Sequence, residues 1–378
     1  MLAHLRFPVT RSRGRRFPEP AHPYRNGFQR DRDRIVHSRA FRRLEAKTQV
    51  FTQGLSDHFR NRLTHTIEVS QMARTVAAVL GLDEDLTEAL ALAHDIGHPP
   101  FAHAGEEELH RQMQRFGGRF DHNLHALRIV ENFEARYARF PGLNLTFEVR
   151  EGIIKHSRDF GPGEFTEFDE YLPGFRPPLE AQLIDLADEA AYNTADLDDA
   201  FSAGMLTAGD VAEHVPQYRL ILEALQSRFP EASGRELFNE SLRHLIDGLV
   251  SGLIEGTVEN ARASGAKTVD DVRAWPQRLA GFSPQAAETS RQLKRFLFAN
   301  VYSAPELAHD RTRAVAMIGA LFQFFLDQPD RLPPPYAEHA RQAPAFRVVC
   351  DYIAGMTDGF LRRTYEQTVG DGATLPRQ

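Results

Sequence analysis

The 378-residue sequence has few of the features that mark a disulfide-stabilised, membrane-spanning or nucleic-acid-coating protein. Its single cysteine, Cys350, excludes an internal disulfide framework and a zinc site built from thiolates. It contains no apolar run of about 18 residues, so we expect no membrane span and no membrane partner. The formal net charge of −7 argues against broad coating of nucleic acid but is compatible with a local basic pocket.

The pattern of a secretory leader is also missing from the first residues. The stretch MLAHLRFPVTRSRGRR is basic but has no continuous apolar segment. We therefore expect a cytoplasmic location.

Strand patterns and internal repeats are scarce, and apolar residues recur at helical spacing along most of the chain. The sequence predicts an all-α fold in three parts: an extended, Pro- and Arg-rich arm over 1–29, a core over 30–215 that holds the chemistry, and a helical C-terminal region over 216–378 that packs on the core. Residues 157–178 favour a long surface loop or lid, and residues 255–285 a looser connection with short helices. The main predicted helices span residues 63–80, 86–95, 124–137, 149–156, 179–200, 218–250, 286–302, 311–326 and 345–365.

The strongest chemical signal is a set of imidazoles and carboxylates: His65, His94, Asp95 and Asp188. A lone histidine on a helix is more often a core or surface residue than a ligand, and adjacent helical side chains point about 100° apart. Here, however, His94-Asp95 ends an apolar helix and Asp188 lies on another, where an unpaired carboxylate would be costly to bury. Such donors suit a borderline-to-hard divalent cation. Four protein ligands leave room for water or a phosphate oxygen on an octahedral ion, so the set favours metal-assisted attack on phosphorus.

Asp188, Tyr192 and Asp196 follow one another at intervals of four residues and share one face of the helix predicted over 179–200. A metal-binding carboxylate, an aromatic plate and a hydrogen-bond acceptor would lie about 6 Å apart per step. This order fits a phosphate, a sugar and a sugar hydroxyl. The alternative is a core tyrosine and a carboxylate that caps a helix or pairs with arginine, and the spacing alone does not separate the two.

Arg62 lies three residues before His65 and shares its face, so its guanidinium is a candidate for a bidentate phosphate contact. Several arginines of residues 30–43 are instead typical of a solvated charged face. Four further side chains are candidates for acid–base chemistry, because imidazole titrates near neutral pH and a carboxylate can tune it: His98, His103, Glu106 and His122.

Six stretches match one known family: residues 30–51 (RDRDRIVHSRAFRRLEAKTQVF), 57–69 (DHFRNRLTHTIEV), 94–107 (HDIGHPPFAHAGEE), 120–128 (FDHNLHALR), 179–200 (LEAQLIDLADEAAYNTADLDDA) and 351–358 (DYIAGMTD). Through them the chain resembles the HD-domain deoxynucleoside triphosphate (dNTP) triphosphohydrolases, in their bacterial dGTPase-like branch. The combination is more specific than the bare HD signature, which many phosphohydrolases share. The resemblance implies an all-α HD-domain fold with an appended helical C-terminal region.

The resemblance also implies a role at each matching position. The implied metal ligands are His65, His94, Asp95 and Asp188, with Mg²⁺ or Mn²⁺ as the cation. The implied catalytic histidine is His103, with Glu106 as its carboxylate partner, and His122 is implied to face the reacting phosphate. The implied substrate contacts are Gln49 and Asp196 to the sugar 3′-hydroxyl, Tyr192 to the deoxyribose, and Arg62.

Four positions depart from the family pattern without removing a ligand: Phe59 and Asn61, where Tyr and Thr are common, and Ala102 and His125, where Gly and Gln are common. We expect Ala102 to alter the backbone beside His103, and His125 to alter contacts to base or phosphate.

These observations predict a metal-dependent hydrolase that converts dNTPs to a deoxynucleoside and inorganic triphosphate. Two alternatives stay open: another HD-domain phosphohydrolase, such as a nucleotidase or phosphodiesterase, and a nucleotide-sensing or nucleic-acid-binding protein that uses the site only to bind. The resemblance favours a homo-oligomer. It leaves open a dNTP as allosteric activator and weak binding of single-stranded nucleic acid.

Overall fold

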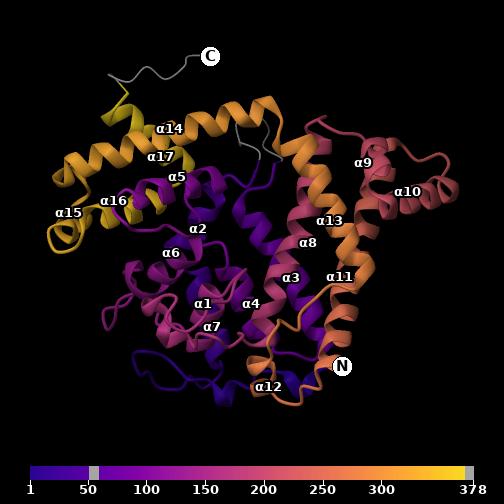
Figure 1. The fold of residues 1–378 in the computed structure, drawn as a ribbon, viewed down its shortest axis with the longest axis horizontal. Coiled ribbons are helices and arrows are strands. Elements are labelled where there is room, and N and C mark those ends of the chain that lie inside the picture. Colours follow the sequence, from indigo (N-terminus) through magenta and orange to yellow (C-terminus); the bar gives the residue numbers. More distant parts are fainter. Residues whose placement is uncertain (51–58, 371–378) are drawn as a thin grey trace. The chain divides into compact units, whose positions relative to one another are not determined.

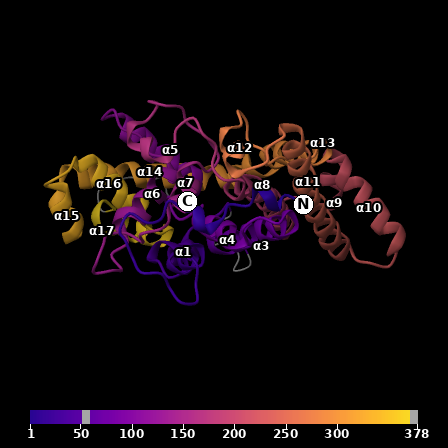
Figure 2. The same ribbon diagram turned by 90° about the horizontal axis from the view of Figure 1, so that it is seen from below.

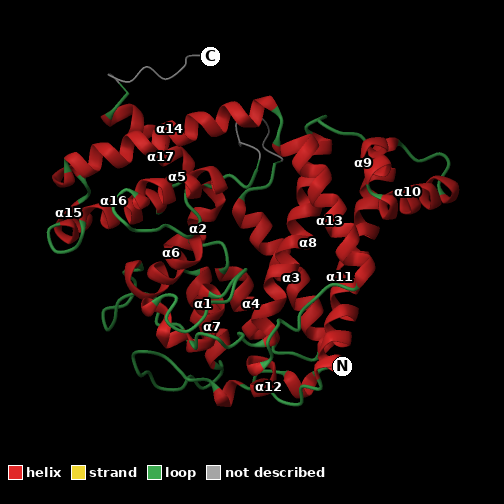
Figure 3. Ribbon diagram, viewed as in Figure 1, coloured by secondary structure: helices red, strands yellow, loops and turns green. Residues whose placement is uncertain are grey.

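The computed structural model describes residues 1–50 and 59–370 of the chain. Within these ranges the regular structure is helical and no strand is present, so Figure 3 shows only helices and connecting loops. This confirms the predicted all-α fold. In the described part of the chain, no helix is long and apolar enough to cross a membrane. Residues 51–58, which include parts of two resembling stretches, lie outside the described residues.

The chain forms two compact units that interleave along the sequence. The first unit comprises Met1–Ile35, His65–Leu92 and Leu145–Ala304. The second unit comprises Val36–Thr64, Ala93–Asn144 and Pro305–Gln378. The predicted boundaries after residues 29 and 215 stay a prediction.

The first unit is built around long helices. Its α-helices are α1 (Gly27–Val36), α3 (Arg62–Leu80), α4 (Glu84–Ala93), α7 (Phe147–Ile154), α8 (Leu179–Ser202), α9 (Ala208–His214), α10 (Pro216–Arg228), α11 (Gly234–Ser264), α12 (Val269–Ala274) and α13 (Pro284–Leu297). Short 3₁₀ or π turns are η1 (Ala3–Leu5), η2 (Val9–Arg11), η5 (Thr166–Tyr171) and η6 (Phe298–Tyr302). Helices α8, α11 and α13 pack on one another (Figures 1 and 2).

The second unit packs α5 (Ala102–Gln114) against α14 (Pro305–Asp327) and α16 (Ala345–Ala354), as Figure 1 shows. Its core includes Leu109, Ile318 and Val349, which are fully buried. Its other elements are α2 (Arg39–Arg43), η3 (Leu44–Ala46), α6 (His122–Arg128), the π-helical η4 (Ile129–Phe133), η7 (Pro329–Arg331), α15 (Pro334–Ala340) and α17 (Asp358–Thr368).

Helix α3 confirms the predicted helix over 63–80. Not all of its apolar side chains are buried, since Ile67 and Val79 are 53% and 44% exposed. The buried side of the helix carries Ala73 and Ala77, together with the polar His65. The larger Val69, Met72, Val76 and Leu80 are also buried, so α3 packs through both small and large apolar side chains.

The predicted helix over 218–250 is in fact two helices. Helix α10 ends at Arg228, and α11 starts after Ser233, whose side chain and that of Glu236 form a capping box. Such a pair satisfies two of the free N–H groups at a helix start. Helix α11 then runs to Ser264. About the first third of residues 255–285, which we predicted as a looser connection, is therefore helical.

The segment over 157–178 is irregular, as predicted, but it is fastened to the first unit. Phe160, Phe168 and Tyr171 are buried. The Lys155 Nζ donates to the carbonyl oxygens of Leu172 (2.9 Å) and of Phe175 (2.8 Å). Aromatic side chains and a buried amine therefore hold most of this segment in place.

Glu180, near the start of α8, is a buried carboxylate that ties the N-terminal arm to the first unit. Its Oε1 accepts hydrogen bonds from the backbone N–H groups of Phe7 (2.8 Å) and Asp83 (3.1 Å). Burial, only partly offset by these bonds, raises the pKa of Glu180 to about 7. The folded state therefore binds a proton here at a pH at which the unfolded chain has lost it.

This shift predicts a pH-dependent stability. Because the folded pKa lies above the unfolded value of 4.5, the contribution of Glu180 is complete below pH 4.5 and declines as the pH rises through about 7. Glu180→Gln, which cannot ionise, should gain stability relative to the wild type between pH 5 and pH 8, by up to about 3 kcal/mol. Urea unfolding of both proteins at the two pH values measures this difference. A difference that does not change with pH contradicts the prediction.

Candidate active site

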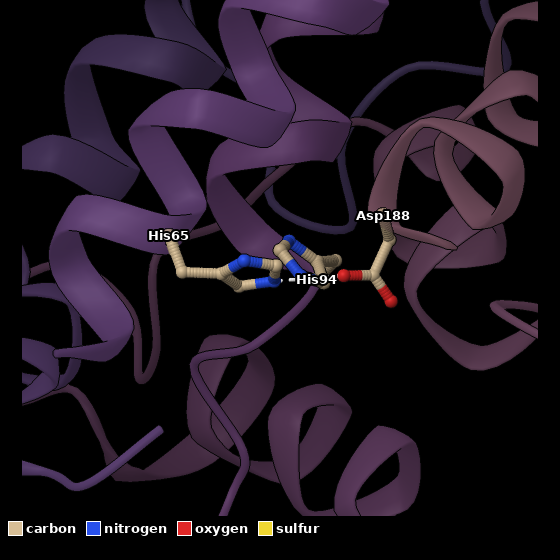
Figure 4. A group of neighbouring side chains, drawn as sticks. All are labelled: His65, His94 and Asp188. Atoms are coloured by element: carbon tan, nitrogen blue, oxygen red, sulfur yellow. Dashed lines mark hydrogen bonds and ion pairs between the residues drawn. The ribbon is translucent and has the colours of Figure 1, made fainter. Parts of the chain in front are cut away.

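In the first unit, α3 and α8 bring an imidazole and a carboxylate together. The Nε2 of His65 lies 2.8 Å from the Oδ1 of Asp188, and Figure 4 shows the two side chains facing each other. His65 is buried, whereas the Asp188 side chain is 30% exposed. One turn further along α8, the ring of Tyr192 meets that of His65 edge-on, with centroids 6.4 Å apart. His94, the third side chain labelled in Figure 4, belongs to the second unit and is described with it.

Asp196, one turn beyond Tyr192, is buried and accepts a hydrogen bond from the hydroxyl of Tyr302 in η6. The rings of Tyr192 and Tyr302 lie 5.9 Å apart. Burial and the neighbouring Asp196 carboxylate raise the pKa of Tyr302, so its phenol stays protonated and able to donate. Tyr302 was not predicted from the sequence, because 106 residues separate it from Asp196.

In the second unit, Asp95 is a buried carboxylate surrounded by cationic or potentially cationic groups. Its Oδ2 accepts a hydrogen bond of 2.7 Å from Arg62 Nη1, and its Oδ1 lies 2.9 Å from His98 Nδ1 and 3.4 Å from His94 Nε2. Burial alone would raise the pKa of Asp95, but His98, Arg62 and His94 together hold it well below its usual range. Asp95 is therefore ionised, and Arg62 is committed to it in this structure.

Glu106 lies between two histidines of the second unit. Its Oε1 lies 2.8 Å from His122 Nδ1 and accepts the backbone N–H of His122 at 2.9 Å, while its Oε2 lies 3.8 Å from His103 Nδ1. The ring of His98 stacks on that of His122 with centroids 4.0 Å apart. Burial opposes ionisation of Glu106, but the neighbouring His103 and His122 outweigh it and lower the pKa of this carboxyl. Glu106 thus holds His122 more closely than His103, the partner expected from sequence.

Together, His98, His103 and Glu106 can present ligand or proton-transfer atoms within 4.8 Å of one another. Burial and the charge of Arg62 lower the pKa of His98, which is therefore neutral near pH 7. The His103 side chain, in contrast, is 66% exposed. The cluster therefore combines buried, oriented groups with one imidazole open to solvent.

The turn between His98 and His103 has an unusual backbone. Phe101 and Ala102 both adopt left-handed φ angles, 61° and 53°, a conformation that glycine adopts without strain. Alanine at position 102 therefore holds a strained backbone beside His103. Gly97 is required for a different reason: a Cβ there would lie 2.0 Å from the carbonyl oxygen of His122.

Asn61 and His125, which we expected to depart from the family pattern, both have structural roles here. Asn61 caps α3, because its Oδ1 accepts the backbone N–H of Thr64 at 3.0 Å. His125 is buried with its Nδ1 3.6 Å from an oxygen of Asp351, and burial lowers its pKa. In this structure His125 is thus part of the packing of the second unit.

Gln49 is buried in the second unit, and its Oε1 finds no hydrogen-bond partner among the described residues. The neighbouring Lys47 is also buried, and burial lowers the pKa of its amine to about 7. Its Nζ donates to the backbone carbonyl oxygens of His98 and Ala354. No role for Lys47 was predicted from the sequence, since its partners lie 51 and 307 residues away.

Two protein-family models match parts of the chain. The family model of the HD domain matches residues 62–193, which include the candidate ligands from His65 to Asp188. The model of a phosphohydrolase-associated domain matches residues 280–367. With its helical fold and its clusters of imidazoles and carboxylates, the chain is an HD-domain phosphohydrolase.

Curated relatives narrow the family further. A deoxyguanosinetriphosphate triphosphohydrolase-like protein of Azoarcus sp. is 47% identical over 362 residues, which cover 96% of this chain and 94% of that protein. Proteins of the same description from Caulobacter vibrioides and Geobacter sulfurreducens are 44% and 46% identical, over 93% of this chain and 92% and 90% of theirs. The chain belongs to the deoxyguanosinetriphosphate triphosphohydrolase-like family.

The Arg62–Asp95 pair leads to a prediction about stability. Arg62→Met leaves a buried carboxylate without its guanidinium and should lower the free energy of unfolding by about 3 kcal/mol. Adding Asp95→Asn to this variant should recover part of the loss, because the stranded charge disappears. Urea unfolding of the single and double variants, in the presence of a metal chelator, measures the coupling free energy between Arg62 and Asp95. Strictly additive losses would show that the two groups do not depend on each other.

Proposed function

We propose that the chain catalyses metal-dependent hydrolysis of dNTPs to a deoxynucleoside and inorganic triphosphate. The observation that carries this proposal is the face of α8, where Asp188, Tyr192 and Asp196 follow one another at single-turn intervals beside His65. A phosphate-side ligand, a plate for a sugar and an acceptor for a sugar hydroxyl occur in the order in which a nucleotide presents these groups. Family membership supports the same reading.

The proposed metal ligands are His65, His94, Asp95 and Asp188. Two imidazoles and two carboxylates fit Mg²⁺ or Mn²⁺, and the Asp95 carboxylate is kept ionised, as a ligand must be. When bound, such a cation supplies stabilisation of charge on a phosphate oxygen and lowers the pKa of a water. The close pair His65–Asp188, 2.8 Å apart, supports the fit, because these two donors already converge.

The second unit supplies groups for proton transfer. Glu106 fixes the orientation of His122 through two contacts, and the exposed His103 is free to meet a substrate. One imidazole can take the proton of the attacking water or deliver one to the leaving 5′-oxygen. We propose His103 as the catalytic histidine, with Glu106 and His122 assisting it.

We propose that the sugar is recognised by Gln49, Tyr192 and Asp196, with Arg62 near the phosphates. The Oε1 of buried Gln49, which has no hydrogen-bond partner within the described part of the chain, is the proposed acceptor for a 3′-hydroxyl. Tyr302 belongs to this set, because its hydroxyl fixes the Asp196 carboxylate. The family resemblance further leads us to expect a homo-oligomer in the cytoplasm, with an activating dNTP and weak single-stranded nucleic acid binding still open.

Metal binding should depend on Asp188. We expect Asp188→Ala to lose most bound Mn²⁺ and at least about 100-fold in turnover, because it removes both a ligand and a charge. Asp198→Ala, which removes a half-buried carboxylate of the same helix outside the ligand set, is the matched control. Metal analysis and chromatography of the products from each dNTP, singly and mixed, measure both effects. Full metal content and normal turnover in Asp188→Ala would reject this ligand set.

Sugar selection should depend on Tyr192. An aromatic ring against C2′ leaves no space for a 2′-hydroxyl, so the wild type should strongly prefer dGTP over GTP. Tyr192→Ala should reduce this preference about 10-fold or more, whereas Tyr192→Phe, which keeps the ring, should retain it. The ratio of kcat/KM values for the two nucleotides is the measurement. Equal hydrolysis of GTP and dGTP by the wild type is incompatible with the proposed sugar site, and release of a nucleoside mono- or diphosphate would identify another phosphohydrolase.

A further inference from the structure

The start of α17 hydrogen-bonds to the backbone of two segments of the second unit, and each segment carries a proposed active-site residue. Asp358, the first residue of α17, is buried. Its Oδ1 accepts the backbone N–H of Phe101 at 3.1 Å, and its Oδ2 accepts the backbone N–H of Thr48 at 2.8 Å. Thr48 immediately precedes Gln49, and Phe101 lies two residues before His103.

Lys47 makes a second link between the same segments. Its Nζ donates to the carbonyl oxygen of His98 and, at 3.2 Å, to that of Ala354 at the end of α16. The carbonyl of Lys47 in turn accepts the backbone N–H of Arg62 at 3.2 Å. The turn from His98 to Phe101 is therefore held at both ends, by Lys47 at the first and by Asp358 at the last.

This turn needs such support for two reasons. Phe101 and Ala102 keep left-handed backbones, which persist in residues other than glycine only where surrounding contacts determine them. Phe101 is also the N-cap of α5, and its apolar side chain offers no acceptor to the first turn of that helix. Asp358 accepts the N–H of this N-cap residue, as the glutamate of a capping box does, although it comes from a helix 257 residues away.

We propose that Asp358 and Lys47 form a clamp that positions the histidine-bearing turn and the Gln49 segment for the reaction. Asp358 lies outside residues 62–193, which match the HD domain, and within residues 280–367, which match the associated domain. The associated domain thus contributes a positioning residue to the site. The catalytic part of this inference rests on the proposed function, whereas the clamp itself is a property of the backbone.

Asp358→Asn tests the clamp with little change in volume. The amide oxygen can accept one of the two N–H groups, but the amide nitrogen then faces the other donor. Glu108→Gln is the matched control, because Glu108 is a buried carboxylate of the same unit whose hydrogen bonds run to Arg111 and Gln112 of its own helix. Lys47→Met removes the second link and replaces the buried amine by an apolar chain of similar length.

We expect Asp358→Asn to lower kcat about 10- to 100-fold and to raise KM for a dNTP, with Mn²⁺ content unchanged. Amide hydrogen exchange in peptides covering residues 98–104 should become faster in Asp358→Asn and Lys47→Met but not in Glu108→Gln. Wild-type kcat and KM in a folded Asp358→Asn protein would overturn the positioning role.

Unchanged exchange in that variant would overturn the clamp itself. If Asp358→Asn does not fold, the kinetic constants and the amide exchange of Lys47→Met test the clamp in its place. If the wild type hydrolyses no dNTP, the proposed function fails, and the exchange comparison still decides whether the clamp exists.

Discussion

The buried carboxylate of Asp95 is the constraint on which much of the site depends. A charge with so little exposure is tolerated only where cations and hydrogen-bond donors surround it. Arg62 provides the closest of these contacts, and His98 and His94 provide the others. Satisfying this single charge therefore holds three segments of the second unit together: Arg62, the His94–Asp95 pair and the turn that carries His98.

Interactions distant in sequence then keep that turn in its strained form. Asp358 and Lys47 hold its two ends through backbone groups, and Gly97 allows it to approach the backbone of α6. The same close approach brings the ring of His98 onto that of His122. The orientation of His98 and His122 is thus a consequence of packing in the whole second unit, including helices near the C-terminus.

In the first unit, the candidate residues are ordered by the regular spacing of a single helix, α8. On α8, side chains four residues apart point the same way. Asp188 contacts His65, whereas Tyr192 and Asp196 both contact Tyr302. A rigid, mostly buried helix of 24 residues is well suited to present several groups in fixed order. This register is the main structural support for a nucleotide as substrate.

The amino-acid sequence by itself determined the all-α class, the existence of most helices and the shared face of Asp188, Tyr192 and Asp196, because these follow from helical periodicity and composition. It did not show that Glu106 holds His122 more closely than His103, that Tyr302 fixes Asp196, or that Asp358 supports the turn at Phe101. These contacts join residues 16, 106 and 257 positions apart. Only the tertiary structure decided them, because no local pattern encodes which distant polar group will satisfy a buried donor or charge.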